Sequence, residues 1–416
     1  MKNFIADVHL HSKYSRAVSS HMTIPTMSLW AKKKGIQLLG TGDWTHPFWF
    51  SELQKDLKET GTGLYERDGI FYILSCEISL IYSQGGKTRR IHIVVLAPSL
   101  SVVEKINAKL SKRGNLLSDG RPILGLTAKE LAELIFSLSP DCFLLPAHIW
   151  TPWFSLYGSK SGFDSLEECF GEFATKITAV ETGLSSNPSM NWRIKELDTR
   201  GIVSFSDAHS PQKLGREACV LSCALTYKDI ISAFSAPRKD MGLAATIEFY
   251  PEEGKYHFTG HRKCGVKHSP DETKLLGTTC PVCGAPLTVG VMHRVEELAS
   301  RDEDFVDEKR PPYQMTVPLV EILAEAVGSQ PQSQKVSEHY EGLVKRFGNE
   351  FAVLRDVSIQ DLAKFSSERI ADGIKRVREG KIVVDPGFDG EFGKVKIWGE
   401  GDKDSFNAQM TFFEEK

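Results

Sequence analysis

Short apolar segments of strand type alternate with amphipathic, helix-like segments over the first half of the chain. The predicted strands cover 4–10, 36–42, 71–82, 91–98, 142–147, 178–182 and 201–206. The predicted helices between them include 24–34, 127–137 and 188–200. Because alternating β and α segments with short connections form parallel sheets, seven such strands predict an α/β fold with a closed or nearly closed barrel.

The pattern changes past about residue 240, where a cysteine-containing segment is followed by regular helical spacing of apolar residues. Helices are predicted over 317–329 and 336–379, and the turn-rich segment 385–397 predicts a hairpin. We expect the last residues of the chain to fray. The expected parts are a barrel over 1–240, a small module over 241–300 and a mainly helical domain over 301–416.

The composition is that of an ordinary globular protein. The 416 residues are 41% hydrophobic and 25% charged, which is sufficient for a large buried core. The formal net charge of -3 argues against a grossly basic nucleic-acid binder, although a local basic groove would not change this sum. No apolar run reaches membrane-spanning length and the first strand leaves no room for a signal peptide, so we expect a cytoplasmic protein without membrane contact.

The first predicted strand carries a polar residue at every second position, namely Asp7, His9 and His11. Alternate side chains leave the same face of an extended chain. Burying three such groups together is costly unless something binds them, and a divalent cation is the simplest partner. The alternative is that both histidines are surface residues of an edge strand.

Polar residues also mark the other predicted strands. They are Asp43 with His46, Glu77, His92, His148, Glu181, and Asp207 with His209. Because the carboxyl ends of parallel barrel strands gather at one mouth, these side chains predict a metal site there. His92 lies near the start of its strand, which suggests that this strand runs differently from the others.

Five motifs resemble those of the polymerase and histidinol phosphatase (PHP) superfamily. They are Asp7-Val-His9-Leu-His11-Ser, Gly42-Asp43-Trp44-Thr-His46, Ser75-Cys-Glu77, Pro146-Ala-His148 and Ser206-Asp207-Ala-His209. The resemblance implies a distorted seven-stranded β/α barrel with two or three metal ions at its mouth. On the matching positions, it implies that the ligands are His9, His11, Glu77, His92, His148, Asp207 and His209, with Glu77 bridging two ions. The resemblance also implies that the catalytic residues are His9, Glu77, His148 and Asp207.

The second motif departs from the superfamily pattern. Members usually read Thr-Asp-His, whereas this chain has Gly42-Asp43-Trp44, with His46 two residues late. A third metal position is therefore in question, and Asp43 or His46 could serve it. We expect Asp7 and Glu181 to support the ligands rather than to bind metal.

The ligand types indicate the chemistry. Mixed imidazole and carboxylate ligands suit Zn²⁺, Mn²⁺ or Fe²⁺ better than Mg²⁺, which prefers oxygen ligands. Two such ions about 3.5–4 Å apart can hold a hydroxide and stabilise both the attacking and the leaving oxygen of a phosphate ester. Hydrolysis is therefore the expected reaction, but amide hydrolysis uses similar centres, so the site alone does not fix the substrate.

Aromatic residues lie between the predicted ligands in the sequence, including Trp44, Trp49, Trp150 and Trp153. Each can be ordinary core, but as a set they suggest stacking on a nucleobase taken out of a duplex. Further candidates for DNA or base contact are Tyr14, Arg16, Ser185, Asn187, Asn191 and Arg193. Helix capping is an equally good explanation for the serine and the two asparagines.

The middle segment has the spacing of a zinc site, with Cys264, His268, Cys280 and Cys283 as ligands. The Cys280-Pro-Val-Cys283-Gly turn is characteristic of a zinc knuckle. His268 is the weakest of the four, because His257, His261 or His293 could replace it. A closed site with four ligands is structural, so we expect one structural Zn²⁺.

The order of barrel, zinc module, the segment Val289-Gly-Val-Met-His-Arg-Val-Glu-Glu297 and helical domain resembles the endonuclease Q family over nearly the whole chain. The resemblance implies a repair endonuclease that nicks DNA on the 5′ side of deoxyuridine, hypoxanthine, xanthine and abasic sites. The implied partner is double-stranded or single-stranded DNA with such lesions, and a sliding clamp or another repair protein is a further candidate. We expect a monomer. The basic stretch from Lys364 to Lys381 fits DNA backbone contact, although a solvated face is its default interpretation.

Two other functions remain open. A small-molecule PHP phosphoesterase of the histidinol phosphatase type would explain the barrel but would leave the zinc module and the helices without a task. A catalytically degenerate DNA-binding protein would explain the later segments, but intact ligand types at nearly every strand end argue against it.

Overall fold

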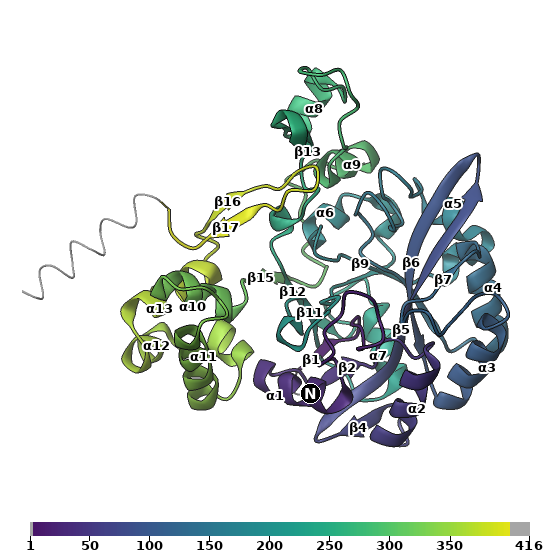
Figure 1. The fold of residues 1–416 in the computed structure, drawn as a ribbon, viewed down its shortest axis with the longest axis horizontal. Helices are drawn as coiled ribbons and strands as arrows, with labels where there is room; N and C mark the ends of the chain where they lie inside the picture. The colour runs from purple at the N-terminus through teal and green to yellow at the C-terminus, as the bar shows by residue number, and fades with distance from the viewer. Residues whose placement is uncertain (1–2, 400–416) are drawn as a thin grey trace, which may run out of the picture.

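The structure is a computed structural model that describes residues 3–399 (Figure 1). The strands of its main sheet are β1 (Phe4–Asp7), β2 (Leu38–Gly40), β3 (Lys58–Glu59), β4 (Tyr65–Arg67), β5 (Ile70–Gln84), β6 (Lys87–Ala97), β7 (Ile123–Leu124), β8 (Phe143–Pro146), β11 (Ala218–Leu221), β12 (Leu243–Glu248) and β15 (Tyr313–Met315). The order along the sheet is β15-β12-β11-β1-β2-β5-β4-β3; β6 and β7 pair with β5, and β8 pairs with β6. The predicted α/β class is confirmed.

The expected parallel pairing holds for only part of this sheet. Strands β1, β2 and β5 are mutually parallel, whereas β6 is antiparallel to β5 and to β8. His92 therefore pairs with Ser79 of β5, and Ser79 lies two residues after Glu77. This places His92 close to Glu77 although it lies near the start of its own strand. The reversed direction of β6 explains how His92 reaches the same edge as residues that follow other strands.

The remaining strand pairs lie outside the main sheet. Strands β9 (Ala179–Glu181) and β10 (Gly201–Val203) are parallel to each other, so all seven predicted strands are present. Backbone hydrogen bonds from Ile149 to Glu181, at 3.2 Å, and from Thr182 to Val203, at 2.9 Å, link the segments that follow β8, β9 and β10.

The main sheet extends past residue 240, because β12 pairs with β11 and β15 pairs with β12.

Helices cover the outside of the sheet (Figure 1). They are α1 (Ile24–Lys34), α2 (Pro47–Asp56), α3 (Leu100–Leu110), α4 (Ala128–Leu138), α5 (Leu166–Phe170), α6 (Pro188–Trp192) and α7 (Tyr227–Phe234). The first two predicted helices agree with α1 and α4, and α4 begins at a capping box in which Thr127 and Glu130 bond each other's backbone. The prediction of a helix over 188–200 is wrong beyond Trp192, because Ile194 is buried with extended backbone angles (φ −98°, ψ 107°).

The middle of the chain forms a small module built on a hairpin of β13 (Thr259–His261) and β14 (Val266–His268), followed by α8 (Pro270–Leu276) and α9 (Val291–Leu298). The predicted hairpin near the C-terminus is present as β16 (Val383–Asp385) and β17 (Lys394–Lys396). Figure 1 shows this second hairpin reaching from the helical part towards the module. The backbone N–H of Phe258 donates to the carbonyl of Gly387 at 2.9 Å, which joins the two.

The last helices are α10 (Leu319–Val327), α11 (Gln334–Phe347), α12 (Ile359–Phe365) and α13 (Glu368–Arg378). The helical prediction over 336–379 holds, but the segment is divided into three helices, because Gly348 has a left-handed φ of 96° and Ser358 and Ser367 cap new helices. These helices share an apolar core of their own that includes Ile322, Leu343, Ile374 and Trp398. The predicted fraying at the chain end falls on residues 400–416, outside the described residues.

A buried ion pair connects the helical part to α1. The ammonium of Lys34 lies 2.7 Å from a carboxylate oxygen of Glu350, which also accepts a hydrogen bond from Tyr340 at 2.6 Å. Both charged side chains are almost completely buried, so the pair must hold one relative orientation to keep its charges satisfied.

No helix within residues 3–399 has both the length and the apolar composition needed to cross a lipid bilayer.

Candidate metal centre

Seven side chains converge at one edge of the sheet in three overlapping groups. The groups are His9 with His11 and Glu77, His11 with Asp207 and His209, and Glu77 with His92 and His148. Within each group the potential ligand atoms lie within 4.8 Å of one another. They come from the segments after β1, β8 and β10 and from the interiors of β5 and β6, so the fold brings together all seven side chains predicted as ligands.

Three of the converging atoms are buried without a hydrogen-bond partner among the described residues: Nε2 of His9, Nε2 of His11 and Oδ1 of Asp207. The His11 nitrogen lies 3.1 Å from the Asp207 oxygen and 3.3 Å from a carboxylate oxygen of Glu77. Buried polar atoms without partners are rare because each costs free energy. A divalent cation bound between them would satisfy all three, so these residues fit a metal centre.

Two carboxylates orient the first pair of histidines. Nδ1 of His9 lies 2.8 Å from Glu181, and Nδ1 of His11 lies 3.0 Å from Asp43. A proton held at Nδ1 leaves the Nε2 lone pair free and turned towards the centre. Glu181 also accepts the backbone N–H of His148 at 2.7 Å, so one carboxylate sets the position of two candidate ligands.

Asp43 is not among the converging ligands, which corrects its assignment as an additional metal ligand. One of its oxygens bonds His11, and the other accepts hydrogen bonds from the backbone and hydroxyl of Ser12, at 2.6 and 2.7 Å, and from Ser15 at 2.9 Å. Both of its carboxylate oxygens are therefore already engaged by the chain itself. His46 also lies outside the groups, with its Nε2 3.2 Å from the carbonyl of Leu117.

Asp7 supports the centre at a greater distance. Its two oxygens accept backbone hydrogen bonds from Ser206 at 3.0 Å and from Gly215 at 2.9 Å. These bonds fix both sides of the loop that carries Asp207 and His209. Burial raises the pKa of Asp7 to about 6, even though both N–H groups favour its charged form.

Burial and neighbouring charges give Glu77 and His92 different protonation states. Burial raises the pKa of Glu77, but His92, Arg121 and His9 outweigh this effect and hold it well below its usual value. Burial lowers the pKa of His92 to about 4, so its imidazole is neutral near pH 7. Glu77 is therefore ionised and His92 neutral, which are the states in which each binds a metal ion.

The backbone is strained at several of these positions. Asp43, His148 and Asp207 have positive φ angles of 49°, 32° and 46°, and so does Phe154, at 63°. Residues other than glycine rarely adopt this left-handed backbone conformation, and those that do cluster at functional sites. Gly183 is required beside His148, because a Cβ at this position would collide with the histidine.

Arg121 is a member of the site that the sequence analysis missed. Its guanidinium donates a hydrogen bond to Glu77 at 3.0 Å. Arg121 belongs to the irregular segment between α3 and β7, which has no metal-ligand motif or helical period. The Asp119-Gly120-Arg121-Pro122 run predicts a tight turn, but not that the turn reaches the metal centre.

Most of the predicted base-contacting tryptophans are packed inside the protein. Trp44, Trp49 and Trp150 are 0% exposed. The indole N–H of Trp49 donates to the carbonyl of Gly42 at 2.8 Å, and that of Trp150 donates to the side chain of Asn191 at 2.8 Å. The prediction that these three rings and the buried Asn191 contact a base is therefore wrong for this conformation.

The polar candidates have local partners as well. Asn187 caps α6 by accepting the N–H of Met190 at 3.1 Å, as the capping interpretation predicts. Arg193 is buried against Glu296 and donates to the carbonyl of Arg301, so its predicted contact with DNA is also wrong. Ser185 is half-buried, and Tyr14 donates to Glu52 at 2.7 Å. Arg16 remains exposed, with a side-chain exposure of 74%.

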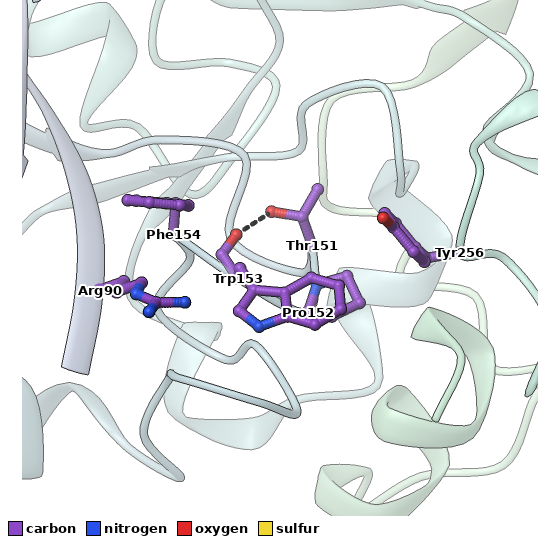
Figure 2. A pocket seen from close by; sticks show the side chains of 6 residues that line it. All are labelled: Arg90, Thr151, Pro152, Trp153, Phe154 and Tyr256. Atoms are coloured by element: carbon purple, nitrogen blue, oxygen red, sulfur yellow. Dashed lines mark hydrogen bonds between the residues drawn. The ribbon is translucent and has the colours of Figure 1, made fainter. Parts of the chain in front are cut away.

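An aromatic groove of about 500 Å³ lies beside the metal centre (Figure 2). The groove is lined by Arg90, Thr151, Pro152, Trp153, Phe154 and Tyr256. The Phe154 ring centre lies 4.7 Å from that of His92, and Trp153 meets Tyr256 edge to face at 5.4 Å. Trp153 is thus the one predicted base-contacting tryptophan that lines an open groove.

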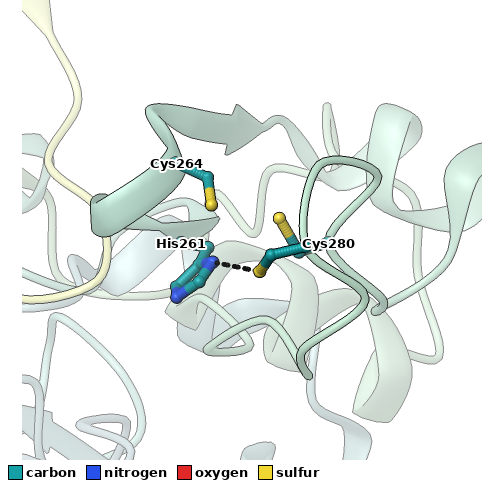
Figure 3. Close-up of side chains that lie close together, drawn as sticks. His261, Cys264 and Cys280 are labelled. Carbon is teal, nitrogen blue, oxygen red and sulfur yellow. Dashed lines mark hydrogen bonds between the residues drawn. The ribbon is translucent and has the colours of Figure 1, made fainter.

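The module contains a second candidate metal site, formed by His261, Cys264, Cys280 and Cys283 (Figure 3). Burial raises the pKa of Cys280, but backbone N–H groups and the imidazole of His261 outweigh this effect and bring it to about 6. A thiol that ionises near neutral pH is ready to bind zinc.

His268 is not part of this second site, which corrects its assignment as a zinc ligand. It pairs with Thr259 at the open end of the β13–β14 hairpin, whereas His261 pairs with Val266 next to the turn that contains Cys264. The hairpin therefore brings His261 to the cysteines and holds His268 away from them. Both histidines lie close to Cys264 in the sequence, and only strand pairing distinguishes them.

Two solved structures are similar to the chain over almost its whole length. The lesion-specific endonuclease PfuEndoQ from Pyrococcus furiosus is 34% identical, with a TM-score of 0.84, covering 97% of this chain and 99% of that one. A complex of endonuclease Q with a 27-mer duplex substrate, with an abasic lesion at its active site, is 35% identical with the same TM-score. It covers 96% of this chain and 98% of the other.

Two curated proteins are also similar to the chain, one over nearly its whole length and one over part of it. The uncharacterized protein YqxK of Bacillus subtilis (strain 168) is 30% identical over 411 residues, which are 95% of this chain and all of YqxK. The uncharacterized protein MJ0043 of Methanocaldococcus jannaschii is 34% identical over 252 residues, or 60% of this chain. The match spans only 31% of the length of MJ0043. The family model of the MJ0043 C-terminal domain matches residues 318–381.

The geometry of the module generates a prediction about metal binding. We predict that His261→Ala weakens metal binding at the cysteine site by at least about 100-fold, whereas His268→Ala leaves it intact. The measurement is the thiolate-to-metal absorption of the Co²⁺-substituted protein, which reports only metal bound to cysteine. Weakening by His268→Ala, with no effect of His261→Ala, would restore the ligand set with His268.

Proposed function

The chain belongs to the endonuclease Q family, and from this membership we propose that it is a metal-dependent, lesion-specific DNA repair endonuclease. We propose further that it hydrolyses the phosphodiester on the 5′ side of abasic sites and of deoxyuridine, hypoxanthine and xanthine. The observation that carries the proposal is the convergence of seven potential ligands around buried atoms without partners.

The proposed centre contains two or three divalent ions of Zn²⁺, Mn²⁺, Fe²⁺ or Mg²⁺, held by His9, His11, Glu77, His92, His148, Asp207 and His209. Bound there, such ions lower the pKa of water and stabilise the oxygens around the phosphorus. The module holds one further Zn²⁺ in a structural role.

The chain's own residues keep this centre in a reactive arrangement. Glu181 and Asp43 retain protons on the far nitrogens of His9 and His11, so that both rings present a lone pair to the centre. In the proposed reaction the oxygen of water bonds to phosphorus and the bond from phosphorus to the upstream O3′ breaks. A proton passes to that oxygen, which leaves a 3′-hydroxyl and a 5′-phosphate.

The aromatic groove is the proposed site of the flipped base. Trp153, Phe154 and Tyr256 offer aromatic rings, and Arg90 lies 5.8 Å from the Phe154 ring centre. Base stacking on aromatic side chains contributes about 1–3 kcal/mol per base, and flipping costs least where a base is damaged or mismatched. The contact of Phe154 with His92 would bring a base held in the groove close to the metal centre.

The proposed division of the chain assigns hydrolysis to the barrel part, 1–240, and duplex contact to the module, 241–300, and the helical part, 301–416. The exposed ammonium groups of Lys364 and Lys375 are suited to phosphate contact. Strands β12 and β15 lie past residue 240 but extend the sheet of the barrel part, so two short segments of the later parts pack with the barrel.

The direct test is cleavage of a labelled duplex that contains one abasic site or one deoxyuridine, with Mn²⁺ or Zn²⁺ added. We expect a single metal-dependent nick on the 5′ side of the lesion and none in an undamaged duplex. Asp207→Asn should lower the single-turnover rate by at least about 100-fold, because it removes a charged ligand. Duplex affinity, measured by fluorescence anisotropy, should change little.

Release of phosphate from small esters with no cleavage of damaged DNA would contradict the proposal and favour a small-molecule phosphoesterase. Full activity of Asp207→Asn would instead remove the proposed centre from the reaction.

The groove generates a second prediction. Trp153→Ala should weaken binding of a deoxyuridine duplex by roughly 5-fold to 100-fold, because a stacking surface is lost. Binding of an abasic duplex should change little, since it has no base to stack. Leu29→Ala, which truncates an exposed apolar side chain on α1, is the matched control. Equal losses on both duplexes would show that Trp153 contacts the DNA backbone instead of the base.

A further inference from the structure

Arg121 faces the metal centre from a segment outside the sheet. Its guanidinium donates to Glu77 at 3.0 Å, and the carboxylates of Glu77, Asp207 and Asp119 all act on its charge. The side chain is 26% exposed, although the Glu77 side chain that it contacts is fully buried. Arg121 therefore connects the buried ligands to the solvent-accessible side of the centre.

Several contacts hold the turn that carries Arg121 in one place. Asp119 accepts the backbone N–H of Arg121 at 3.1 Å, and the N–H of Gly120 donates to the carbonyl of Tyr14 at 3.0 Å. A Cβ at Gly120 would collide with Asp43 and Ser15, so the turn packs directly against the support of His11. The carbonyl of Pro122 accepts the N–H of Ser79 at 3.0 Å. The guanidinium is thus pre-positioned by backbone contacts.

The hydrogen-bonding capacity of Arg121 is only partly used. A guanidinium has five N–H donors, and within residues 3–399 the one side-chain hydrogen bond found for Arg121 is that to Glu77. None of its nitrogens is among the buried atoms without a partner in the described part of the chain, so the remaining donors are accessible to solvent. A group that serves only to neutralise a buried carboxylate has no need of donors that remain open to solvent.

We propose that Arg121 binds a non-bridging oxygen of the phosphate group that is hydrolysed at the metal centre. This inference rests on the proposed function, since it names the side chain that holds the substrate phosphate. Guanidinium groups form charge-assisted, often paired hydrogen bonds with phosphate oxygens. Negative charge on these oxygens is stabilised during phosphoryl transfer by fixed positive groups, so Arg121 acts on the reacting group itself.

The test compares Arg121→Ala and Arg121→Lys with the wild-type chain, with Arg113→Ala as the matched control. Arg113 is an exposed arginine in the same segment, eight positions earlier. Single-turnover cleavage of the abasic duplex is measured with and without added guanidinium, and bound metal is determined by mass spectrometry. Affinity for inorganic phosphate is measured calorimetrically on each metal-loaded protein.

For Arg121→Ala we expect a cleavage rate about 100-fold to 1,000-fold lower, with unchanged metal content. Phosphate affinity should fall about tenfold, added guanidinium should restore part of the rate, and Arg121→Lys should retain an intermediate rate. Arg113→Ala should match the wild type in every measurement.

Loss of metal from Arg121→Ala, without rescue by guanidinium, would overturn the inference and reduce Arg121 to a residue that positions Glu77. Unchanged cleavage and unchanged phosphate affinity would overturn it as well. If the wild-type chain cleaves no damaged duplex, the proposed function fails. Phosphate affinity then decides the inference separately, since a tenfold loss in Arg121→Ala supports phosphate binding and no loss overturns it.

Discussion

Several buried ligand atoms at the candidate metal centre face one another without a hydrogen-bond partner among the described residues. The arrangement of the residues around the centre depends on keeping these atoms unpaired. His9 and His11 can present free Nε2 atoms only because Glu181 and Asp43 occupy their Nδ1 atoms, at 2.8 and 3.0 Å. Those carboxylates are themselves fixed, Asp43 by Ser12 and Ser15 and Glu181 by the backbone of His148. A metal ion bound there would supply the missing interaction, and the cost of burying polar groups would become a source of binding affinity.

The surrounding fold bears the strain that this arrangement creates. Asp43, His148 and Asp207 have left-handed backbones, and neighbouring elements hold each of them in place. Asp7 accepts N–H groups on both sides of the Asp207 loop, and Gly183 leaves room for His148. Strand β6, antiparallel to its neighbours, carries His92 to Glu77, with Nδ1 of His92 2.7 Å from its carboxylate. Contacts made by the residues and strands around the ligands thus decide whether the centre can assemble.

Much of this was predictable from the sequence, and the failures have physical causes. Candidate metal-binding residues could be recognised because polar residues alternate along the first strand and lie on or near the other predicted strands, which are local patterns. The set of seven ligands was implied by the resemblance of five motifs to the PHP superfamily, and the fold brings these seven side chains together. Strand register and tertiary contacts were beyond such patterns. The register of the β13–β14 hairpin selects His261 over His268, and a long-range contact brings Arg121 to Glu77. Burial was also missed, since Trp44 and Trp153 look alike in the sequence although the first is completely enclosed and the second lines a groove. The helices predicted over 336–379 are present, but the breaks between them were not predicted, because a left-handed glycine and new serine caps interrupt an otherwise regular apolar period.

Anomalous X-ray diffraction from crystals grown with Mn²⁺ and Zn²⁺ is the most direct test of the claim that the converging ligands form a metal centre. We expect at least two peaks at the candidate metal centre, one near His9, His11 and Glu77 and one near Glu77, His92 and His148. A separate zinc peak among His261, Cys264, Cys280 and Cys283 would serve as an internal control. That control peak together with no anomalous density around Glu77 would contradict the account.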